Sequence, residues 1–143
     1  MRYLGIDLGS KTIGLSISDE TLTIASAYKT IFFENEDYTG TVSEIMDIVK
    51  ENNIKKIVMG LPKNMNNTLG ERALITLEYK NLLEKALDME IIMVDERLTS
   101  VISNSILIEA DLSRKKRKKK VDSVAAQIIL QDYLDKEKNS GRE

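Results

Sequence analysis

Apolar and polar residues alternate over the first part of the chain, a pattern typical of β-strands. Residues 2–8 and 13–18 are predicted strands, and the segment between them is short enough for a hairpin turn. A third β-rich stretch covers residues 22–33. Three successive strands with short connections predict an antiparallel meander.

The hydrophobic spacing becomes helical after residue 40. Apolar residues recur at helical intervals over 41–52, and Thr41 or Ser43 is a plausible cap for this helix. The remaining predicted elements are a strand at 57–59, a helix at about 70–87, a strand at 91–94 and helices at 99–112 and 121–137.

This order predicts an α/β fold with a mixed five-stranded sheet, three antiparallel strands followed by parallel strands, flanked by helices. A length of 143 residues suits one hydrophobic core better than two. We therefore predict a single domain over residues 1–138 and a frayed polar tail over 139–143.

Composition agrees with an ordinary globular domain, since 42% of the residues are hydrophobic and 31% are charged. No apolar run approaches the roughly 20 residues that cross a bilayer. The first residues turn polar too early for a signal peptide, and the chain contains no cysteine. We expect a cytoplasmic protein without a membrane partner.

The chain also contains no histidine, and the two absences together restrict its chemistry. Neither a thiol nucleophile nor an imidazole base is available, and a zinc site would lack its usual ligands. Any hydrolysis must therefore use carboxylates, hydroxyls, Lys or Arg, or hard metal ions bound by oxygen.

Positive charge is concentrated in one segment, although the net charge of the chain is only −2. Without this segment, 14 basic residues remain against 23 acidic ones, a net charge of −9. Like-charge runs are usually solvated and disordered, so we expect a mobile cationic loop able to hold a phosphate backbone. Few aromatic residues favour recognition by backbone and shape over base stacking. The run consists of Arg114, Lys115, Lys116, Arg117, Lys118, Lys119 and Lys120.

Three carboxylates occupy positions that suggest a site. Asp7 lies inside an apolar strand, Glu96 follows the strand 91–94, and Asp122 opens the predicted last helix. Each also has a structural alternative, namely bonding to a loop backbone, pairing with Arg97, or capping a helix. A buried carboxylate costs several kcal/mol unless it is paired or binds a metal. If the first and fifth strands are neighbours, Asp7 and Glu96 face each other, and such an acidic cluster requires divalent cations.

Four segments in the same order resemble the YqgF/RuvX family, relatives of the RuvC Holliday-junction resolvases. The likeness implies an RNase H-like fold, active-site acids at Asp7, Glu96 and Asp122, and a nuclease that matures the 5′ end of the small-subunit ribosomal RNA precursor. Junction resolution, by analogy with RuvC, is the alternative. The segments are Gly5-Ile6-Asp7-Leu8-Gly9-Ser10-Lys11-Thr12-Ile13-Gly14, Gly60-Leu61-Pro62 with Asn64-Met65 and Gly70, Asp95-Glu96-Arg97-Leu98-Thr99-Ser100, and Asp122-Ser123-Val124-Ala125-Ala126 with Ile129-Leu130.

From this we expect two Mg²⁺ or Mn²⁺ ions bridged by Asp7 and completed by Glu96 and Asp122, in the two-metal pattern of phosphodiester cleavage. Lys11, Arg97 and the cationic run would contact phosphates of structured RNA or branched DNA. RuvC-like enzymes often carry a further acid one turn before the last one. Lys119 occupies that position here, so a fourth ligand is missing.

Two other interpretations compete with the nuclease. The first segment also resembles the phosphate-binding hairpin of the actin, sugar-kinase and heat-shock chaperone superfamily, but those proteins clamp nucleotide between two domains, and 143 residues supply only one. A non-catalytic RNA-binding or ribosome-assembly factor would keep the fold without cleavage. Junction resolution needs a dimer to cut two strands symmetrically, whereas we expect a monomer or a weak dimer.

Overall fold

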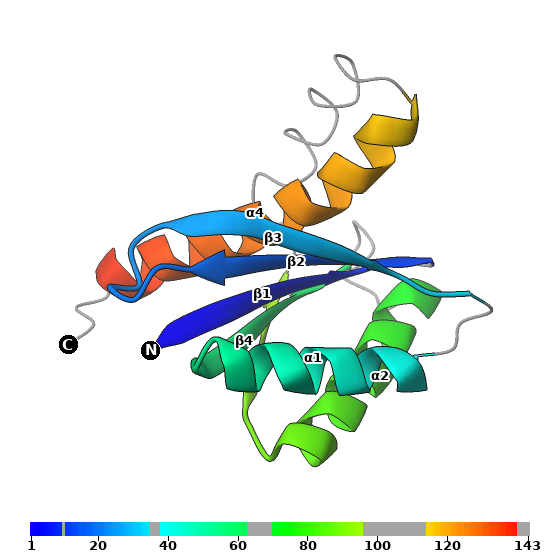
Figure 1. The fold of residues 1–143 in the computed structure, drawn as a ribbon, viewed down its shortest axis with the longest axis horizontal. Coiled ribbons are helices and arrows are strands. Elements are labelled where there is room, and N and C mark those ends of the chain that lie inside the picture. Colours follow the sequence, from blue (N-terminus) through cyan, green and yellow to red (C-terminus); the bar gives the residue numbers. More distant parts are fainter. Residues whose placement is uncertain (10, 35–37, 63–69, 96–113, 140–143) are drawn as a thin grey trace.

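A computed structural model describes residues 1–9, 11–34, 38–62, 70–95 and 114–139, with side chains from residue 123 onward in the last segment. Five strands and three helices occupy these residues (Figure 1). In chain order they are β1 (Arg2–Leu8), β2 (Thr12–Ser18), β3 (Ala25–Phe32), α1 (Thr39–Glu51), β4 (Ile54–Leu61), α2 (Glu71–Leu87), β5 (Ile91–Asp95) and α4 (Arg114–Asn139).

The strands form one mixed sheet in the order β3-β2-β1-β4-β5. Antiparallel pairing joins β1 to β2 and β2 to β3, whereas β1 with β4 and β4 with β5 are parallel. This confirms the predicted sheet but not the suggestion that the first and fifth strands are neighbours. Because β4 lies between them, β1 and β5 are about 10 Å apart across the sheet.

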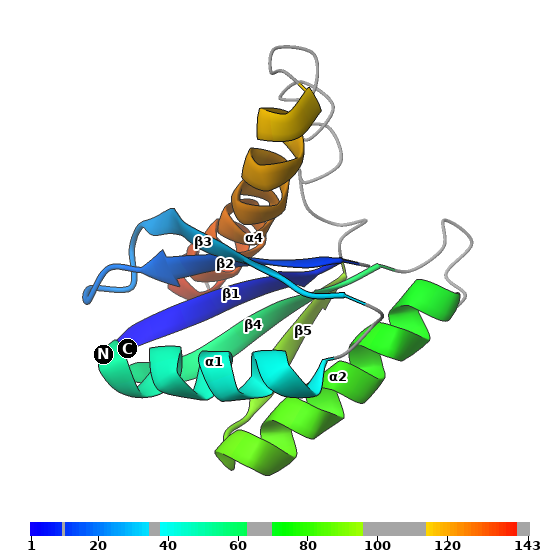
Figure 2. The same cartoon turned by 45° about the vertical axis from the view of Figure 1, so that its right-hand side comes forward.

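The helices cover the two faces of the sheet unequally. Helix α4 lies on one face, and α1 and α2 lie on the other (Figures 1 and 2). Side chains of β1 alternate accordingly, because Leu4, Ile6 and Leu8 join the core beneath α1 and α2, whereas Tyr3 joins the core beneath α4. The face toward which a β1 side chain points therefore follows from its position in the strand.

Helix α1 begins differently from the prediction. Its N-cap is Tyr38, without a side-chain cap hydrogen bond, so neither Thr41 nor Ser43 caps it. The Thr41 hydroxyl instead donates to the carbonyl of Tyr38 at 2.6 Å and is hydrogen-bonded to the Tyr79 hydroxyl of α2 at 2.7 Å. Thr41 thus joins the two helices, a tertiary role that a local capping pattern does not reveal.

Helix α4 is longer than predicted, and it changes the interpretation of the cationic run. It begins at Arg114, so residues 114–120 are helical rather than a loop. Lys and Arg favour helix, and turns that continue from a packed segment need no nucleation of their own. Asp122 consequently lies in the interior of α4 and does not open it, which excludes the interpretation of Asp122 as a helix-start acid.

At its other end, α4 includes Asn139, which was expected to begin the tail. The helix predicted at 99–112 and residues 140–143 of the predicted tail lie outside the described residues. Within the part of the chain that is described, no helix has the length and apolar character needed to cross a membrane.

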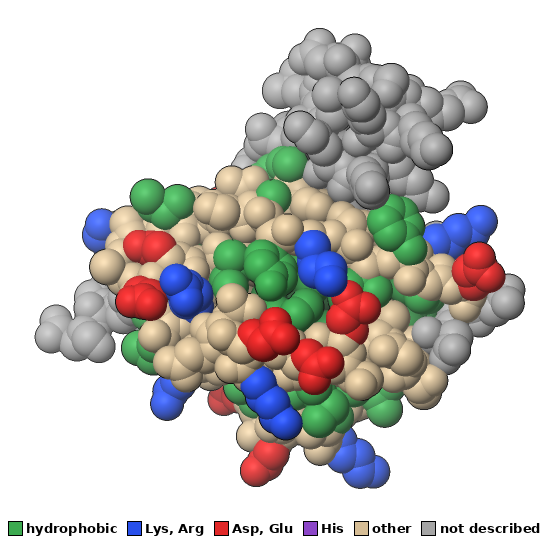
Figure 3. Space-filling model, viewed as in Figure 1, with side chains coloured by type: hydrophobic (Ala, Val, Ile, Leu, Met, Phe, Trp, Pro, Cys, Tyr) green, Lys and Arg blue, Asp and Glu red, His purple; other side chains and the backbone are tan. Residues whose placement is uncertain are grey.

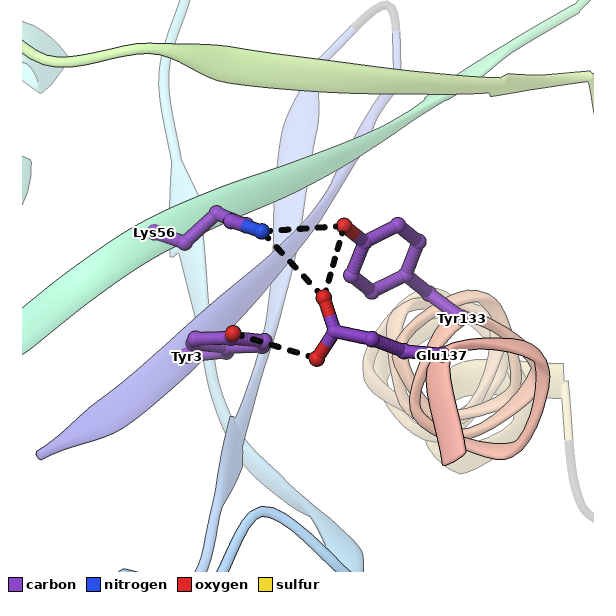
Figure 4. Close-up of polar contacts among 4 residues, drawn as sticks. All are labelled: Tyr3, Lys56, Tyr133 and Glu137. Carbon is purple, nitrogen blue, oxygen red and sulfur yellow. Dashed lines mark hydrogen bonds and ion pairs between the residues drawn. The ribbon is translucent and has the colours of Figure 1, made fainter. Parts of the chain in front are cut away.

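A polar cluster fastens the last turns of α4 to the sheet (Figure 4). It consists of Tyr3, Lys56, Tyr133 and Glu137, hereafter the α4 anchor. The Lys56 ammonium lies 3.2 Å from the Glu137 carboxylate and 3.1 Å from the Tyr133 hydroxyl, and the Tyr3 hydroxyl donates to Glu137 at 3.1 Å. The ammonium is also 5.1 Å from the centre of the Tyr3 ring, within range of a cation–π contact.

These contacts lower the pKa of Glu137 and raise the pKa of Lys56. Burial alone would raise the pKa of Glu137, but the hydrogen bonds from Lys56, Tyr133 and Tyr3 outweigh it and lower that pKa. Burial would likewise lower the pKa of Lys56, but its bonds to Tyr133 and Glu137 raise it above the usual value. Both groups are therefore charged at neutral pH.

We predict that Glu137→Gln lowers the free energy of unfolding at neutral pH by about 1–3 kcal/mol, because Lys56 loses its charged partner. The carboxylate of Glu137 stabilises the fold above the unfolded-state pKa of a glutamate, about 4.3, and this contribution disappears as pH falls through the lowered native pKa. Denaturant unfolding at several pH values should show the difference from the unsubstituted chain shrinking in acid. Asp135→Asn, at an exposed position of the same helix, is the control and should change little.

Candidate active site

Asp7 is the penultimate residue of β1 and is half-buried. Ile6 and Leu8 on either side belong to the core beneath α1 and α2, so the alternation of the strand directs Asp7 to the α4 face. The parallel strands β1, β4 and β5 all end at this side of the sheet, which is where α/β folds place their binding sites. Asp7 thus lies inside an apolar strand, as predicted.

Glycines flank Asp7 on both neighbouring strands. Gly14 of β2 lies directly opposite Asp7. On β4, Gly60 takes the corresponding place, one residue beyond the register pair formed by Ile6 and Met59. The residues directly beside Asp7 on both adjacent strands therefore carry no side chain. The sequence alone did not reveal this arrangement, because the register brings together residues that are far apart in the chain.

Helix α4 packs directly on the backbone of β1 at Gly5, two residues before Asp7. A Cβ atom placed on Gly5 would lie 2.2 Å from Ser16 Oγ, 2.9 Å from the Ala126 carbonyl oxygen and 2.9 Å from Leu130 Cβ. Distances below 3.0 Å to backbone or Cβ atoms are not tolerated, so only glycine permits this approach. Gly5 thus determines how closely α4 lies on the strand that carries Asp7.

Hydrogen bonds fix the position of α4 along the sheet. The Ser16 hydroxyl donates to the Ala126 carbonyl at 2.7 Å, and the hydroxyls of Thr30 and Ser123 are hydrogen-bonded at 2.6 Å. Further along the helix, the Gln131 side chain accepts from the Ala25 amide at 2.8 Å. These bonds join α4 to β2 and β3, so the helix cannot slide without breaking them.

Of the predicted site residues, Asp7 and Lys11 have described side chains. Lys11 is exposed and lies in the turn between β1 and β2, at the same end of the sheet as Asp7. Asp122 lies within α4, one helical turn before Ala126, and its side chain is outside the described part. Glu96 and Arg97 also lie outside it, directly after Asp95, which ends β5.

The predictions about the cationic run and the metal site also involve side chains outside the described residues. The side chains of the cationic run are not described, although its backbone is helical. No group of three acidic residues suited to a metal ion occurs among the described residues. Of the three acids predicted to bind metal, Asp7 is among the described side chains, and those of Glu96 and Asp122 lie outside them.

The glycine-rich first segment has a structural explanation. Gly5 is required by the approach of α4, and Gly9 lies in the hairpin turn, where a Cβ would be in tight contact with Thr12. The Gly9 amide donates to the Thr12 carbonyl at 2.7 Å, and a Cβ on Gly9 would lie 3.0 Å from that oxygen. Neither glycine needs a bound nucleotide to explain it, which weakens the resemblance to nucleotide-clamping proteins.

Comparison with known proteins identifies close relatives of the whole chain. The family model described as RuvX, Holliday junction resolvase, matches residues 1–136. A protein of Clostridium tetani is 50% identical over 135 residues, which cover 94% of this chain and 96% of the relative. A protein of Oceanobacillus iheyensis is 44% identical over 135 residues, covering 94% and 98%. Both relatives carry the name "Putative pre-16S rRNA nuclease".

Two solved resolvases have a similar fold. RuvC of Thermus thermophilus, solved with a Holliday junction substrate, aligns with a TM-score of 0.62 at 12% identity and covers 99% of this chain and 98% of its own. The fowlpox virus Holliday junction resolvase aligns with a TM-score of 0.57 at 12% identity, covering 95% and 99%. At such identities the likeness concerns the fold, which is the RNase H-like fold expected from the sequence.

We predict that Gly5→Ala destabilises the protein by about 1–3 kcal/mol, because the added methyl group overpacks the contact between β1 and α4. Gly40→Ala is a matched control, since a Cβ at Gly40 in α1 meets no atom within 4 Å. In a helix this change should be neutral or stabilising by about 0.5–1 kcal/mol. Thermal and denaturant unfolding of both variants measure the difference. Equal stability of the two would show that the contact is not tight.

Proposed function

Because this chain belongs to the RuvX family, we propose that it is a nuclease that hydrolyses phosphodiester bonds at the 5′ end of precursor 16S rRNA. The observation that carries the proposal is the placement of Asp7 between two glycines at the end of β1, on the face covered by α4. The relatives named for this substrate match over nearly their whole length. We place the reaction in the cytoplasm, in keeping with the cysteine-free composition.

In this proposal Asp7, Glu96 and Asp122 together hold two catalytic metal ions, which are Mg²⁺ or Mn²⁺. The register of α4 supports the role of Asp122. Ala126 packs above Gly5, so the helix position one turn earlier lies toward the end of β1, where Asp7 is. Carboxylate oxygens are the ligands that these ions prefer.

Glu96 would approach from the far side of β4, since it follows the last residue of β5. Gly60 on β4 supports this geometry, because it presents no side chain between the end of β5 and Asp7. Lys119, one turn before Asp122 in the same helix, takes the place of a fourth acid. Two ions would therefore share three carboxylates.

The chemistry follows from this arrangement. When bound, such ions lower the pKa of a water molecule and compensate the charge that develops on the leaving oxygen. The carboxylates hold and orient the reacting groups, and Lys11 contacts a phosphate beside the cut. No step needs a histidine or a cysteine, which agrees with a chain that contains neither.

We predict that Asp7→Asn abolishes cleavage, because the amide is a weaker metal ligand than the carboxylate. The fold should stay intact or become more stable, because the substitution removes a negative charge from an apolar strand. The assay is cleavage of an RNA that spans the 5′ boundary of 16S rRNA, in Mg²⁺ or Mn²⁺. Mn²⁺ should raise the melting temperature of the unsubstituted chain and not that of the variant. An unchanged cleavage rate in Asp7→Asn would remove Asp7 from the mechanism.

The helical cationic run, Arg114–Lys120, is proposed to bind the phosphate backbone of the substrate. On the face drawn in Figure 3, acidic and basic side chains are interspersed, so the described part of that face offers no other extended cationic surface. Such contacts release counterions, which makes binding strongly dependent on salt.

We predict that Lys116→Gln combined with Lys118→Gln reduces the slope of log binding constant against log salt concentration by about 1–2. Lys136→Gln combined with Lys138→Gln removes the same charge from exposed positions at the other end of α4 and should leave the slope unchanged. Filter binding of the precursor RNA at several salt concentrations measures both. Equal slopes in the two double variants would contradict the proposed role of the run.

Junction resolution is the second candidate, favoured by the description of the matching family model. It requires two copies of the chain on one four-way DNA junction, so that both strands are cut symmetrically. Sedimentation with a junction, together with cleavage rates on junction and precursor RNA, separates the two functions. A dimer that cuts the junction faster than the RNA would favour resolution.

A further inference from the structure

An aromatic ring lies exposed near the candidate active site. Phe32 is the last residue of β3, and its side chain is 57% exposed. A single exposed hydrophobic residue is common on protein surfaces and needs no explanation by itself. The position of Phe32 relative to Asp7 and Lys11 is what gives it significance.

The sheet register places Phe32 on the same face as Asp7. Asp7 pairs with Gly14, Gly14 pairs with Thr30, and Thr30 is hydrogen-bonded to Ser123 of α4. Phe32 is two residues beyond Thr30, so it shares the α4 face. β1 and β3 are two strand spacings apart, so Phe32 lies about 10 Å from Asp7 across the sheet. Along the strands, Phe32 lies about 7 Å beyond Asp7, toward the end of the sheet where β1 ends. This separation suits a group that binds a neighbour of the reacting nucleotide.

Phe32 also lines an open cavity of about 570 Å³ together with Lys11, Thr12, Phe33 and Glu34. The Phe33 amide donates to the Lys11 carbonyl at 3.0 Å, which ties the end of β3 to the hairpin turn. Thr12 and Phe33 are buried, whereas Lys11, Phe32 and Glu34 are exposed. The cavity therefore has a fixed base, with an aromatic ring, a cation and a carboxylate accessible to a ligand.

These three groups match the parts of a nucleotide. An aromatic ring stacks on the face of a base, and an ammonium group binds the phosphate. The Glu34 carboxylate disfavours a phosphate beside it, but it can accept hydrogen bonds from the amino groups of a base. A paired base cannot reach such a ring, because its faces are covered by its neighbours in the stack.

We propose that Phe32 stacks on an unpaired base that flanks the cleaved phosphodiester, while Lys11 binds the adjacent phosphate. This inference rests on the proposed nuclease function and deepens it, because it makes a single-stranded segment beside the cut part of the recognised substrate. Stacking of this kind tolerates any base, so the contact recognises the unpaired state and not the sequence.

The test measures binding of short oligoadenylate RNAs by fluorescence anisotropy, at low salt and in EDTA so that no cleavage intervenes. One RNA is complete, and each of the others lacks the base at a single position. Phe32→Ala should weaken binding of the complete RNA by roughly 5- to 150-fold, and Phe32→Tyr should preserve it. Removal of the stacked base should weaken binding to the unsubstituted chain but not to Phe32→Ala.

Leu74→Ala is the matched control, because Leu74 is 52% exposed but lies on α2, which covers the opposite face of the sheet. It should leave binding unchanged, and unfolding curves should show that all variants are folded. If the unsubstituted chain binds but Phe32→Ala binds equally well, or Leu74→Ala loses as much, the stacking proposal is overturned and the nuclease proposal stands. If the unsubstituted chain binds none of these RNAs, the stacking proposal is likewise overturned, and the proposed function is overturned only if the chain also fails to cleave the precursor RNA in Mg²⁺ or Mn²⁺.

Discussion

The contact between Gly5 and helix α4 is the constraint on which the candidate site depends. Because Gly5 has no Cβ, the backbone of α4 can lie against the backbone of β1 at this point. The Ser16 bond to Ala126 and the α4 anchor then fix the helix along its length. A site built from one strand and one helix needs this rigidity, since displacements of about 1 Å can impair catalysis. The close approach thus links a local packing requirement to the geometry proposed for Asp7 and Asp122.

Much of the fold could be predicted because its elements have local signatures. The alternation in β1 and β2 and the helical spacing in α1 and α2 gave elements close to those observed. The predictions were wrong where tertiary context decides. Arg114–Lys120 was expected to be a loop from its charge, but it is part of a helix whose later turns pack on the sheet. Strand order is also invisible to local patterns, so nothing in the sequence placed β4 between β1 and β5.

The candidate site also contains residues that the local sequence predicts and residues whose importance depends on the sheet register. Asp7 could be predicted from a single stretch of sequence, since a carboxylate inside an apolar strand is costly without a partner. Gly14 and Gly60 could not, because their importance comes from lying beside Asp7 in the register of two different pairings. The proposal for Phe32 likewise depends on the register. Counting aromatic residues gave too few for a stacking surface, whereas one ring in the right register is enough for one base.

The two ends of α4 differ in the charges that their sequences carry. At the C-terminal end, Lys56 and Glu137 neutralise each other within the α4 anchor. At the N-terminal end, seven consecutive cations share the same turns, and like charges three or four residues apart destabilise a helix. A polyanion bound there, as proposed, would relieve that repulsion and would stabilise the helix at this end. The α4 anchor holds the helix on the sheet by contacts within the protein, so this stability would not depend on the proposed binding of substrate at the opposite end.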